Sequence, residues 1–320
     1  MKNARLPKRQ RGVALITAIL VVALATLLAA DMVWNQYLQM RRTESMLAME
    51  QGRMYALGAE SWAMDIMLED RESPDDIDHL LEIWAEDLPP LELDEGSLIG
   101  AIEDMQGRLN INNIYRNGQV DQIAYDQLTR LLEVLGLDVQ LAEAVLDWID
   151  LDQDVCCAAG AEDDTYTART PAHRAANRYI TSTSELLAIE GFDNDTYRAL
   201  EPYIAALPPG WCGGGEFTPV NINTASDKVL LALDANITEA NTDQWIAERE
   251  EIDGYRDLSA FDGAVSQDLL DGEYLSLNSE CFGVTAVISI GSFGYSMYSL
   301  LDRDGKAGTI VARIRYFGVY

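Results

Sequence analysis

An uninterrupted apolar run near the N-terminus constrains this chain more than any other feature. Val13 to Ala30 contains no charged side chain, and most of its residues are apolar. As an α-helix the run would be about 27 Å long, close to the ~30 Å thickness of a bilayer's hydrocarbon core. Asp31 ends it, and Trp34 and Tyr37 follow where interfacial aromatic residues are expected. The run therefore predicts a membrane-spanning helix.

Charge is divided between a short basic leader and an acidic body. Residues 1–12 contain five lysines and arginines and no acid, whereas the whole chain has 23 basic and 53 acidic residues and a net charge of −30. Basic flanks stay in the cytoplasm, so we expect the acidic body to cross the membrane. Such a negative body also argues against nucleic-acid binding, because phosphates would be repelled.

Helical patterning continues beyond the apolar run. Apolar residues recur at three-, four- or seven-residue spacing as far as Leu57, and no proline occurs between Asp31 and Leu68. We expect one helix over residues 13–68. The alternative is a cleaved secretory signal ending near Ala25, but such a signal needs no continuing amphipathic helix.

Strand patterns occur in two places that are separated by about 160 residues of mostly helical sequence. The first is residues 97–111, with a turn expected at Gln106-Gly107. The second comprises Gly283–Ile290, Tyr295–Leu301 and Thr309–Tyr316, which are rich in β-branched and aromatic residues. Asp304-Gly305 predicts a hairpin turn between the last two strands.

These patterns predict an α+β fold: a long N-terminal helix on an antiparallel sheet, with a large inserted α-helical domain. The predicted parts are a leader (1–12), a membrane and stalk helix (13–68), the first strands of the sheet (69–111), the inserted helical domain (112–272) and the C-terminal sheet (273–320).

The predicted insert contains an internal repeat. Leu109-Asn110-Ile111-Asn112-Asn113 resembles Val220-Asn221-Ile222-Asn223-Thr224, and each is followed by a leucine-rich helix and then by a Trp-Ile pair. The repeat indicates two helix-hairpin-helix-like units. Units of this kind often bind DNA, so a periplasmic DNA-uptake protein is one alternative. The acidic surroundings favour a helical scaffold whose apolar positions form a core.

The N-terminus resembles a known family of envelope proteins. Arg11-Gly12 followed by Val13-Ala14-Leu15-Ile16 resembles a type IV prepilin leader. The resemblance implies that a prepilin peptidase cuts after Gly12 and that Val13 becomes the methylated first residue. Pilins usually carry glutamate at the fifth position after the cut, where this chain has Thr17. That difference, together with the large size, resembles the minor pseudopilin K family of type II secretion.

The resemblance implies a structural role rather than an enzymatic one. It implies a minor pseudopilin that caps the tip of the pseudopilus, initiates the filament and supports protein export across the outer membrane. The implied partners are minor pseudopilins I and J, other pseudopilins, the prepilin peptidase and the inner membrane, with no nucleic acid. The chain would be a single-pass inner-membrane protein with its large C-terminal part in the periplasm. A minor pilin of a type IV pilus is the other alternative.

The most acidic loop is a candidate cation site. Seven carboxylates occur in the 18 residues from Asp147 to Asp164, and hard oxygen ligands of this kind suit calcium. The spacing of Asp150, Asp152 and Asp154 matches the start of an EF-hand loop, but the glycine and the final glutamate of that motif are missing. A solvated acidic loop is therefore the simpler alternative on composition alone.

The same segment resembles a calcium-binding stretch of the pseudopilin K family. The resemblance implies a structural calcium ion whose expected ligands are Asp150, Asp152, Glu162, Asp163 and Asp164. Asp147 is expected to lie further back on the preceding helix.

The four cysteines are Cys156, Cys157, Cys212 and Cys281, and they allow three full pairings. A bond between the adjacent pair would close a strained ring, and this pairing stays open. We expect Cys212 to pair with Cys281, which would tie the centre of the insert to the first C-terminal strand.

Overall fold

The computed structural model describes residues 13–71, 76–86, 88–94, 96–213, 215–304 and 309–319. The leader, including Gly12, lies outside the described residues. The helices are α1 (Val13–Arg71), α2 (Gln122–Val134), α3 (Leu141–Ile149), α4 (Asp163–Thr167), α5 (Asn194–Leu200), α6 (Asp227–Leu233), α7 (Glu239–Glu251) and α8 (Gln267–Asp271). The strands are β1 (Leu91–Leu93), β2 (Gly96–Asp104), β3 (Leu109–Asn110), β4 (Tyr115–Arg116), β5 (Gln119–Val120), β6 (Ile204–Ala205), β7 (Val220–Asn221), β8 (Leu275–Ser276), β9 (Cys281–Ile290), β10 (Phe293–Asp304) and β11 (Thr309–Val319).

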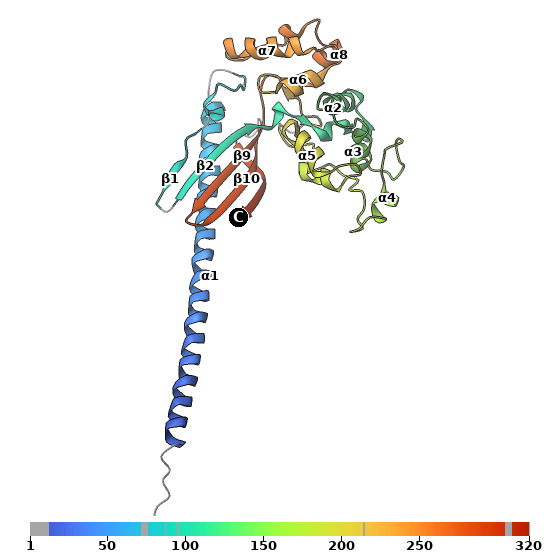
Figure 1. The fold of residues 1–320 in the computed structure, drawn as a ribbon. Coiled ribbons are helices and arrows are strands. Elements are labelled where there is room, and N and C mark those ends of the chain that lie inside the picture. The colour runs from blue at the N-terminus through green and yellow to red at the C-terminus, as the bar shows by residue number, and fades with distance from the viewer. Residues whose placement is uncertain are drawn as a thin grey trace, which may run out of the picture.

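One long helix, α1, forms a stalk that projects from the rest of the molecule (Figure 1). Residues 13–44 are all exposed, and this helix is apolar and long enough near its start to cross a membrane. Further along, Gly52, Ala56, Ala63 and Met67 are buried at helical spacing. The prediction of one continuous helix is confirmed, and the helix runs three residues beyond the expected end at Leu68. Its first half is free for lipid or partner helices, and its second half packs on the sheet.

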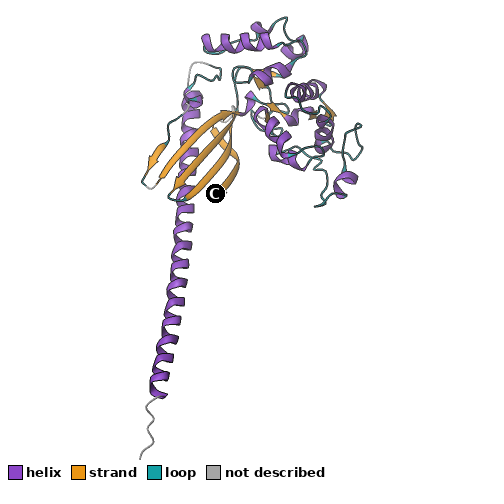
Figure 2. Ribbon diagram, viewed as in Figure 1, coloured by secondary structure: helices purple, strands orange, loops and turns teal. Residues whose placement is uncertain are grey.

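The sheet that covers the upper part of α1 has five antiparallel strands in the order β1-β2-β9-β10-β11 (Figure 2). Its inner face meets the helix through an apolar layer that includes Ala56, Leu98, Ile288 and Met297. The predicted C-terminal strands are confirmed, and β10 and β11 pair antiparallel. Gly305 of the predicted Asp304-Gly305 turn lies outside the described residues. Neighbouring strands β2 and β9 are far apart in sequence, because the chain leaves the sheet at Asp104 and returns at Cys281.

The expected turn at Gln106-Gly107 is present, but the residues after it do not belong to this sheet, so the prediction that the first strands of the sheet extend to residue 111 is wrong. Beyond Asp104 the chain makes a 3-10 turn, and β3 then pairs in parallel with β6 inside the insert. Gln106 is held by distant backbone: its Oε1 accepts from Glu280 N at 2.6 Å, and its Nε2 donates to Pro219 O at 3.2 Å. The insert therefore begins near residue 105 and ends near residue 280, outside both predicted limits.

The internal repeat is visible in the backbone pairing of the insert. The first unit is closed by the parallel pair β3–β6 and the second by the parallel pair β7–β8. In the first unit, the Asn112 amide binds both the N–H and the C=O of Ile180, at 2.8 Å each. In the second, Asn223 binds the N–H and the C=O of Tyr255 in the same way, at 2.7 and 3.0 Å. The repeated Asn-Ile-Asn segments thus have a structural role, because the second asparagine of each bonds to the backbone of a distant residue in its own unit.

Both units share one hydrophobic core, which runs from Leu109 to Tyr274 and includes Leu131, Trp148 and Trp245. The insert is therefore a single packed body. It lies at the end of the sheet that is remote from the start of α1 (Figure 1). A disulfide between Cys212 and Cys281, with Cα atoms 5.0 Å apart, joins it to the first residue of β9. This is the pairing favoured by the sequence.

Candidate cation site

Helix α3 positions the first carboxylate of the candidate site. Its apolar residues Val145, Trp148 and Ile149 are buried in the core of the insert. Asp147 lies on the same short helix and is 0% exposed. Asp150 follows immediately at the end of α3, and Glu162 immediately precedes α4. The two ends of the 150–162 loop, Asp150 and Glu162, therefore lie close together.

Asp147, Asp150 and Glu162 form what we name the acidic site. One oxygen from each lies within 4.8 Å of the others. Asp150 is 7% exposed and Glu162 is 3% exposed. Among the described residues, Asp147 Oδ2, Asp150 Oδ1 and both Glu162 oxygens have no hydrogen-bond partner. Four unpartnered acceptor oxygens from three buried carboxylates are an arrangement that a bound cation would satisfy, and that the protein alone does not.

The electrostatics of the acidic site agree with this geometry. Burial, together with the neighbouring Asp150 and Asp147 carboxylates, raises the pKa of Glu162 to about 7. Burial likewise raises the pKa of Asp150 to about 6, helped by Asp152 and Asp147. Each shift means that the ionised form is disfavoured when no cation is present. A hard divalent cation with oxygen ligands would reverse that preference.

One neutral residue, Asn177, is bonded to the backbone on both sides of Asp150. Asn177 Oδ1 is buried without a hydrogen-bond partner in the part of the chain that the structure describes. Its backbone N–H donates to Trp148 O at 3.0 Å, and its side-chain amide donates to Asp152 O. Asn177 is therefore a candidate ligand that sequence reasoning missed. A single asparagine far from the acidic run carries no signal that would have found it.

The residues expected as ligands are only partly brought together. Asp150 and Glu162 belong to the acidic site, whereas Asp152 and Asp164 are exposed. Asp152 Oδ1 accepts from Asp154 N at 2.9 Å, and Asp163 Oδ1 accepts from Ala175 N at 3.0 Å. Coordination by these three residues stays a prediction.

Asp147 lies on the helix as expected, in α3, and its carboxylate is nevertheless within the site. The loop packs closely against it, because a Cβ added at Gly160 would lie 2.2 Å from Asp147 Oδ2. Gly160 is therefore required by this close approach.

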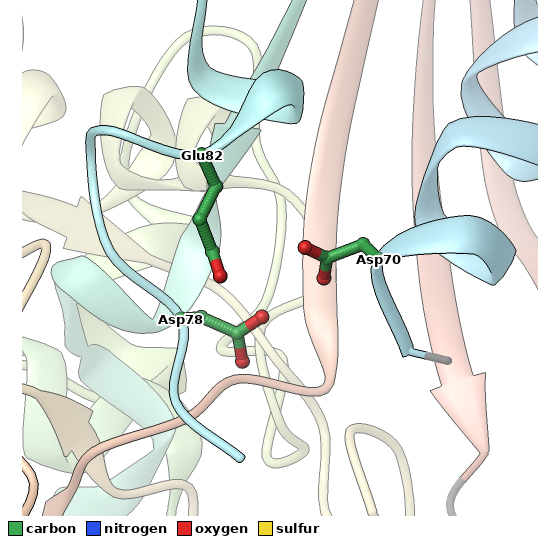
Figure 3. A group of neighbouring side chains, drawn as sticks. All are labelled: Asp70, Asp78 and Glu82. Atoms are coloured by element: carbon green, nitrogen blue, oxygen red, sulfur yellow. The ribbon is translucent and has the colours of Figure 1, made fainter. Parts of the chain in front are cut away.

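A second group of carboxylates lies at the end of the stalk. Asp70, from α1, faces Asp78 and Glu82, from the segment that follows (Figure 3). Arg303 of β10 enters this group: Nη1 donates to Asp70 at 2.8 Å and Nη2 to Asp78 Oδ1 at 2.7 Å. Glu82 Oε2 accepts from Trp84 Nε1 at 2.6 Å. These carboxylates have protein partners, so the group joins stalk, sheet and insert and does not match the acidic site.

Comparisons with known proteins agree with one another over most of the chain. Two family models described as "Type II secretion system (T2SS), protein K" match residues 107–209 and 220–285. Type II secretion system protein K of Pseudomonas aeruginosa is 33% identical, over 97% of this chain and 93% of the relative. Its counterpart in Klebsiella pneumoniae is 31% identical, over 98% of each chain.

A solved structure shares the fold. It is the crystal structure of the GspK-GspI-GspJ complex from the enterotoxigenic Escherichia coli type 2 secretion system, and the matched chain is 26% identical to this one. The TM-score is 0.74, with 87% of this chain and 99% of that chain covered. That chain therefore shares the overall fold of this one. This chain belongs to the type II secretion system protein K family.

Proposed function

We propose that this protein is the minor pseudopilin that caps the tip of the type II secretion pseudopilus. The position of the insert carries the proposal. The insert leaves the sheet between β2 and β9 and occupies the end remote from the start of α1 (Figure 1). In a filament built from parallel stalk helices, a body of this size at that end would block addition of a subunit ahead of it. The same body does not obstruct subunits that are added on the side of the start of α1.

The start of the stalk is consistent with a leading position. Pilin-type assembly uses a glutamate near the start of each helix to meet the subunit ahead. Here the corresponding residue is Thr17, whose hydroxyl donates to Ala14 O of its own helix at 3.0 Å. Thr17 therefore needs no partner in another subunit, unlike a carboxylate buried in lipid.

The partners follow from the same geometry and from the family. Residues 13–44 of α1 are exposed around the whole helix, which leaves them available to pack against the helices of minor pseudopilins I and J. The related chain from Escherichia coli was solved in complex with GspI and GspJ. We propose the equivalent complex here, with the stalk in the inner membrane and the sheet and insert in the periplasm.

Location at the tip can be tested by labelling. The full-length protein would carry an epitope at the end of α7, where Glu250 and Glu251 are exposed, and gold-labelled antibody would be imaged on purified pseudopili. We expect gold at one end of each filament, while the same epitope on the major pseudopilin labels the whole length. Gold distributed along filaments that contain this protein would refute the cap.

Processing at Gly12 is a separate proposal. A prepilin peptidase would cut after Gly12 and leave Val13, the first residue of α1, as the methylated N-terminus. Mass spectrometry of the protein from cells with and without the peptidase tests this directly. A mature N-terminus that does not depend on the peptidase would contradict it.

We further propose that the acidic site binds calcium and that the ion has a structural role. Asp147, Asp150 and Glu162 would supply carboxylate oxygens, and Asn177 would supply an amide oxygen. The ion would join α3 to the start of α4 and so fix the 150–162 loop. The unpartnered buried oxygens support this proposal.

A further inference from the structure

The 150–162 loop also contains two thiols that the proposed function does not use. Cys156 and Cys157 are adjacent in sequence, exposed and free. The only other cysteines of the chain, Cys212 and Cys281, are joined to each other and buried. A chain that matures with this buried disulfide passes through an oxidising compartment. Exposed thiols in the same chain meet the same oxidants.

The loop that carries the two thiols is fastened to α3. Cys156 N donates to Asp147 Oδ1 at 3.1 Å, and Ala159 N donates to Glu143 Oε2 at 2.8 Å. Cys156 Sγ lies 3.9 Å from Glu143 O. Asp147 thus contributes one oxygen to the backbone of Cys156 and the other to the acidic site. Any constraint on the backbone at Cys156 is passed to the acidic site through a single carboxylate.

We propose that Cys156 and Cys157 form a reducible vicinal disulfide in the mature protein, and that closing this ring holds the 150–162 loop in its cation-binding arrangement. Neighbouring residues are tethered to each other, so this bond forms without a large loss of chain entropy. The second part of the inference rests on the proposed calcium site, whereas the first part does not.

The oxidation is an ordinary thiol–disulfide exchange. A disulfide compound such as glutathione disulfide accepts attack by the sulfur of one cysteine, which forms a mixed disulfide and releases one thiol. The neighbouring sulfur then displaces the second thiol and closes the ring. The protein loses two protons and two electrons, and the oxidant takes them up as two thiols.

The two disulfides of the chain should differ in stability towards reductants. Adjacent Cα atoms are only about 3.8 Å apart, below the usual range for a disulfide of about 4.4–6.8 Å. Strained and exposed disulfides are the more easily reduced ones. The vicinal bond should therefore open at a low concentration of dithiothreitol that leaves the buried Cys212–Cys281 bond intact.

The redox state is measured first, on full-length protein purified in detergent without reductant. The protein is denatured, alkylated with iodoacetamide and mapped by peptide mass. We expect a peptide that contains unalkylated Cys156 and Cys157 and is lighter by two hydrogen atoms than the dithiol. In the matched Cys156→Ser variant, Cys157 should be alkylated. Alkylation of both cysteines in the wild type, or a disulfide from either one to another chain, would overturn the proposal.

Calcium affinity then tests the coupling. The oxidised protein and the protein treated with low dithiothreitol are titrated with calcium. Reduction should weaken binding about fivefold, the factor that follows from restoring the backbone freedom of about one residue. A C156S/C157S variant should bind as weakly as the reduced protein and should not respond to dithiothreitol.

The two parts fail in different ways. Equal calcium affinity in the oxidised and reduced forms would overturn the coupling. Absence of calcium binding in both forms would remove the acidic site as a calcium site, and the coupling with it. The peptide mass would still decide whether the vicinal disulfide exists.

Discussion

Replacing Glu162 by glutamine should change the stability of the insert in opposite directions with and without calcium. Without a cation, the wild type holds a buried carboxylate whose pKa is raised to about 7 from an ordinary value of 4.5. At about pH 8 the folded state must keep this group ionised, at a cost of roughly 3 kcal/mol. Glutamine has nearly the same shape and no charge, and its amide can donate to the unpartnered Asp147 and Asp150 oxygens. E162Q should therefore be more stable than the wild type in EDTA.

Calcium should reverse the order. At a free concentration of about 1,000 times Kd, a ligand that binds only the folded state stabilises it by about 4.1 kcal/mol, which exceeds the roughly 3 kcal/mol cost of the ionised Glu162. The glutamine variant loses one of the three buried carboxylates and should bind the ion much more weakly. For a body of this size, 1 kcal/mol corresponds to a shift in Tm of roughly 2–4 °C. The wild type should gain several degrees on addition of calcium, and E162Q should gain little.

The assay is thermal unfolding of full-length protein in detergent at about pH 8, in EDTA and in calcium. Tryptophan fluorescence can report it, because Trp148 packs edge-on against Tyr166, with ring centroids 5.1 Å apart. Glu133→Gln is the matched control, since Glu133 is exposed on α2, and it should show no reversal. If E162Q is less stable than the wild type in both solutions, Glu162 is an ordinary packing residue and the reasoning is wrong.

Three further predictions follow from other contacts. First, the stabilisation by calcium should shrink as pH falls from about 8 to 5, because protons compete with calcium for the Asp150 and Glu162 carboxylates, whose pKa values are raised. In EDTA, the insert should lose stability as pH rises from about 4.5 to 7, because these buried carboxylates must then ionise without a cation. A series of Tm values against pH would measure both effects. Second, Gly52→Ala should lower the free energy of unfolding by about 1–3 kcal/mol, since the new Cβ would lie 2.8 Å from the Cβ of Tyr295. A new Cβ at Gly58 meets nothing within 4 Å, so Gly58→Ala should be neutral or slightly stabilising. A denaturant titration of both variants would measure the difference. Third, Arg315→Ala should cost about 1–3 kcal/mol, because it leaves the buried Glu60 carboxylate without the guanidinium that donates to both its oxygens at 2.7 Å. The cost stays below that of a fully buried ion pair, since Arg315 is 41% exposed and Ser299 still donates to Glu60. Adding Glu60→Gln should recover part of the loss, and no recovery would count against the ion pair as the cause.

The elements predicted correctly are those whose signal is local. The start of α1 is specified by eighteen consecutive uncharged residues and the final strands by β-branched and aromatic runs, so no distant contact is needed to recognise them. The predicted end of the first sheet strands, at residue 111, was wrong for the opposite reason, because the chain leaves the sheet before the turn at Gln106-Gly107. The hydrogen-bond partners of Gln106 are the backbone of Pro219 and Glu280, and no sequence pattern near residue 106 predicts these contacts.

The candidate site likewise has one part that local sequence predicts and another that depends on distant contacts. Composition located the acidic loop, because seven carboxylates in 18 residues are visible without any structure. Which of them converge depends on the register of α3 and on the path of the loop back to α4. These place Asp147 inside and leave Asp152 and Asp164 exposed. Asn177 lies near through its bond to Trp148 O, a contact that only tertiary structure creates.

The two acidic groups in the described residues differ in where their positive charge comes from. At the end of the stalk, Arg303 donates to Asp70 and Asp78 and also stacks over Phe282, with its Cζ 5.0 Å from the ring centroid. That cation is part of the chain, so Asp70 and Asp78 have a permanent positive partner at the junction of stalk, sheet and insert. Within the described residues, no lysine or arginine forms an ion pair with Asp147, Asp150 or Glu162, so their charge is left to be balanced from solution. We therefore expect calcium and oxidants to act on the 150–162 loop and to leave the junction unchanged, whereas protons reach both, because burial and the neighbouring Glu82 and Asp78 carboxylates raise the pKa of Asp70 to about 6.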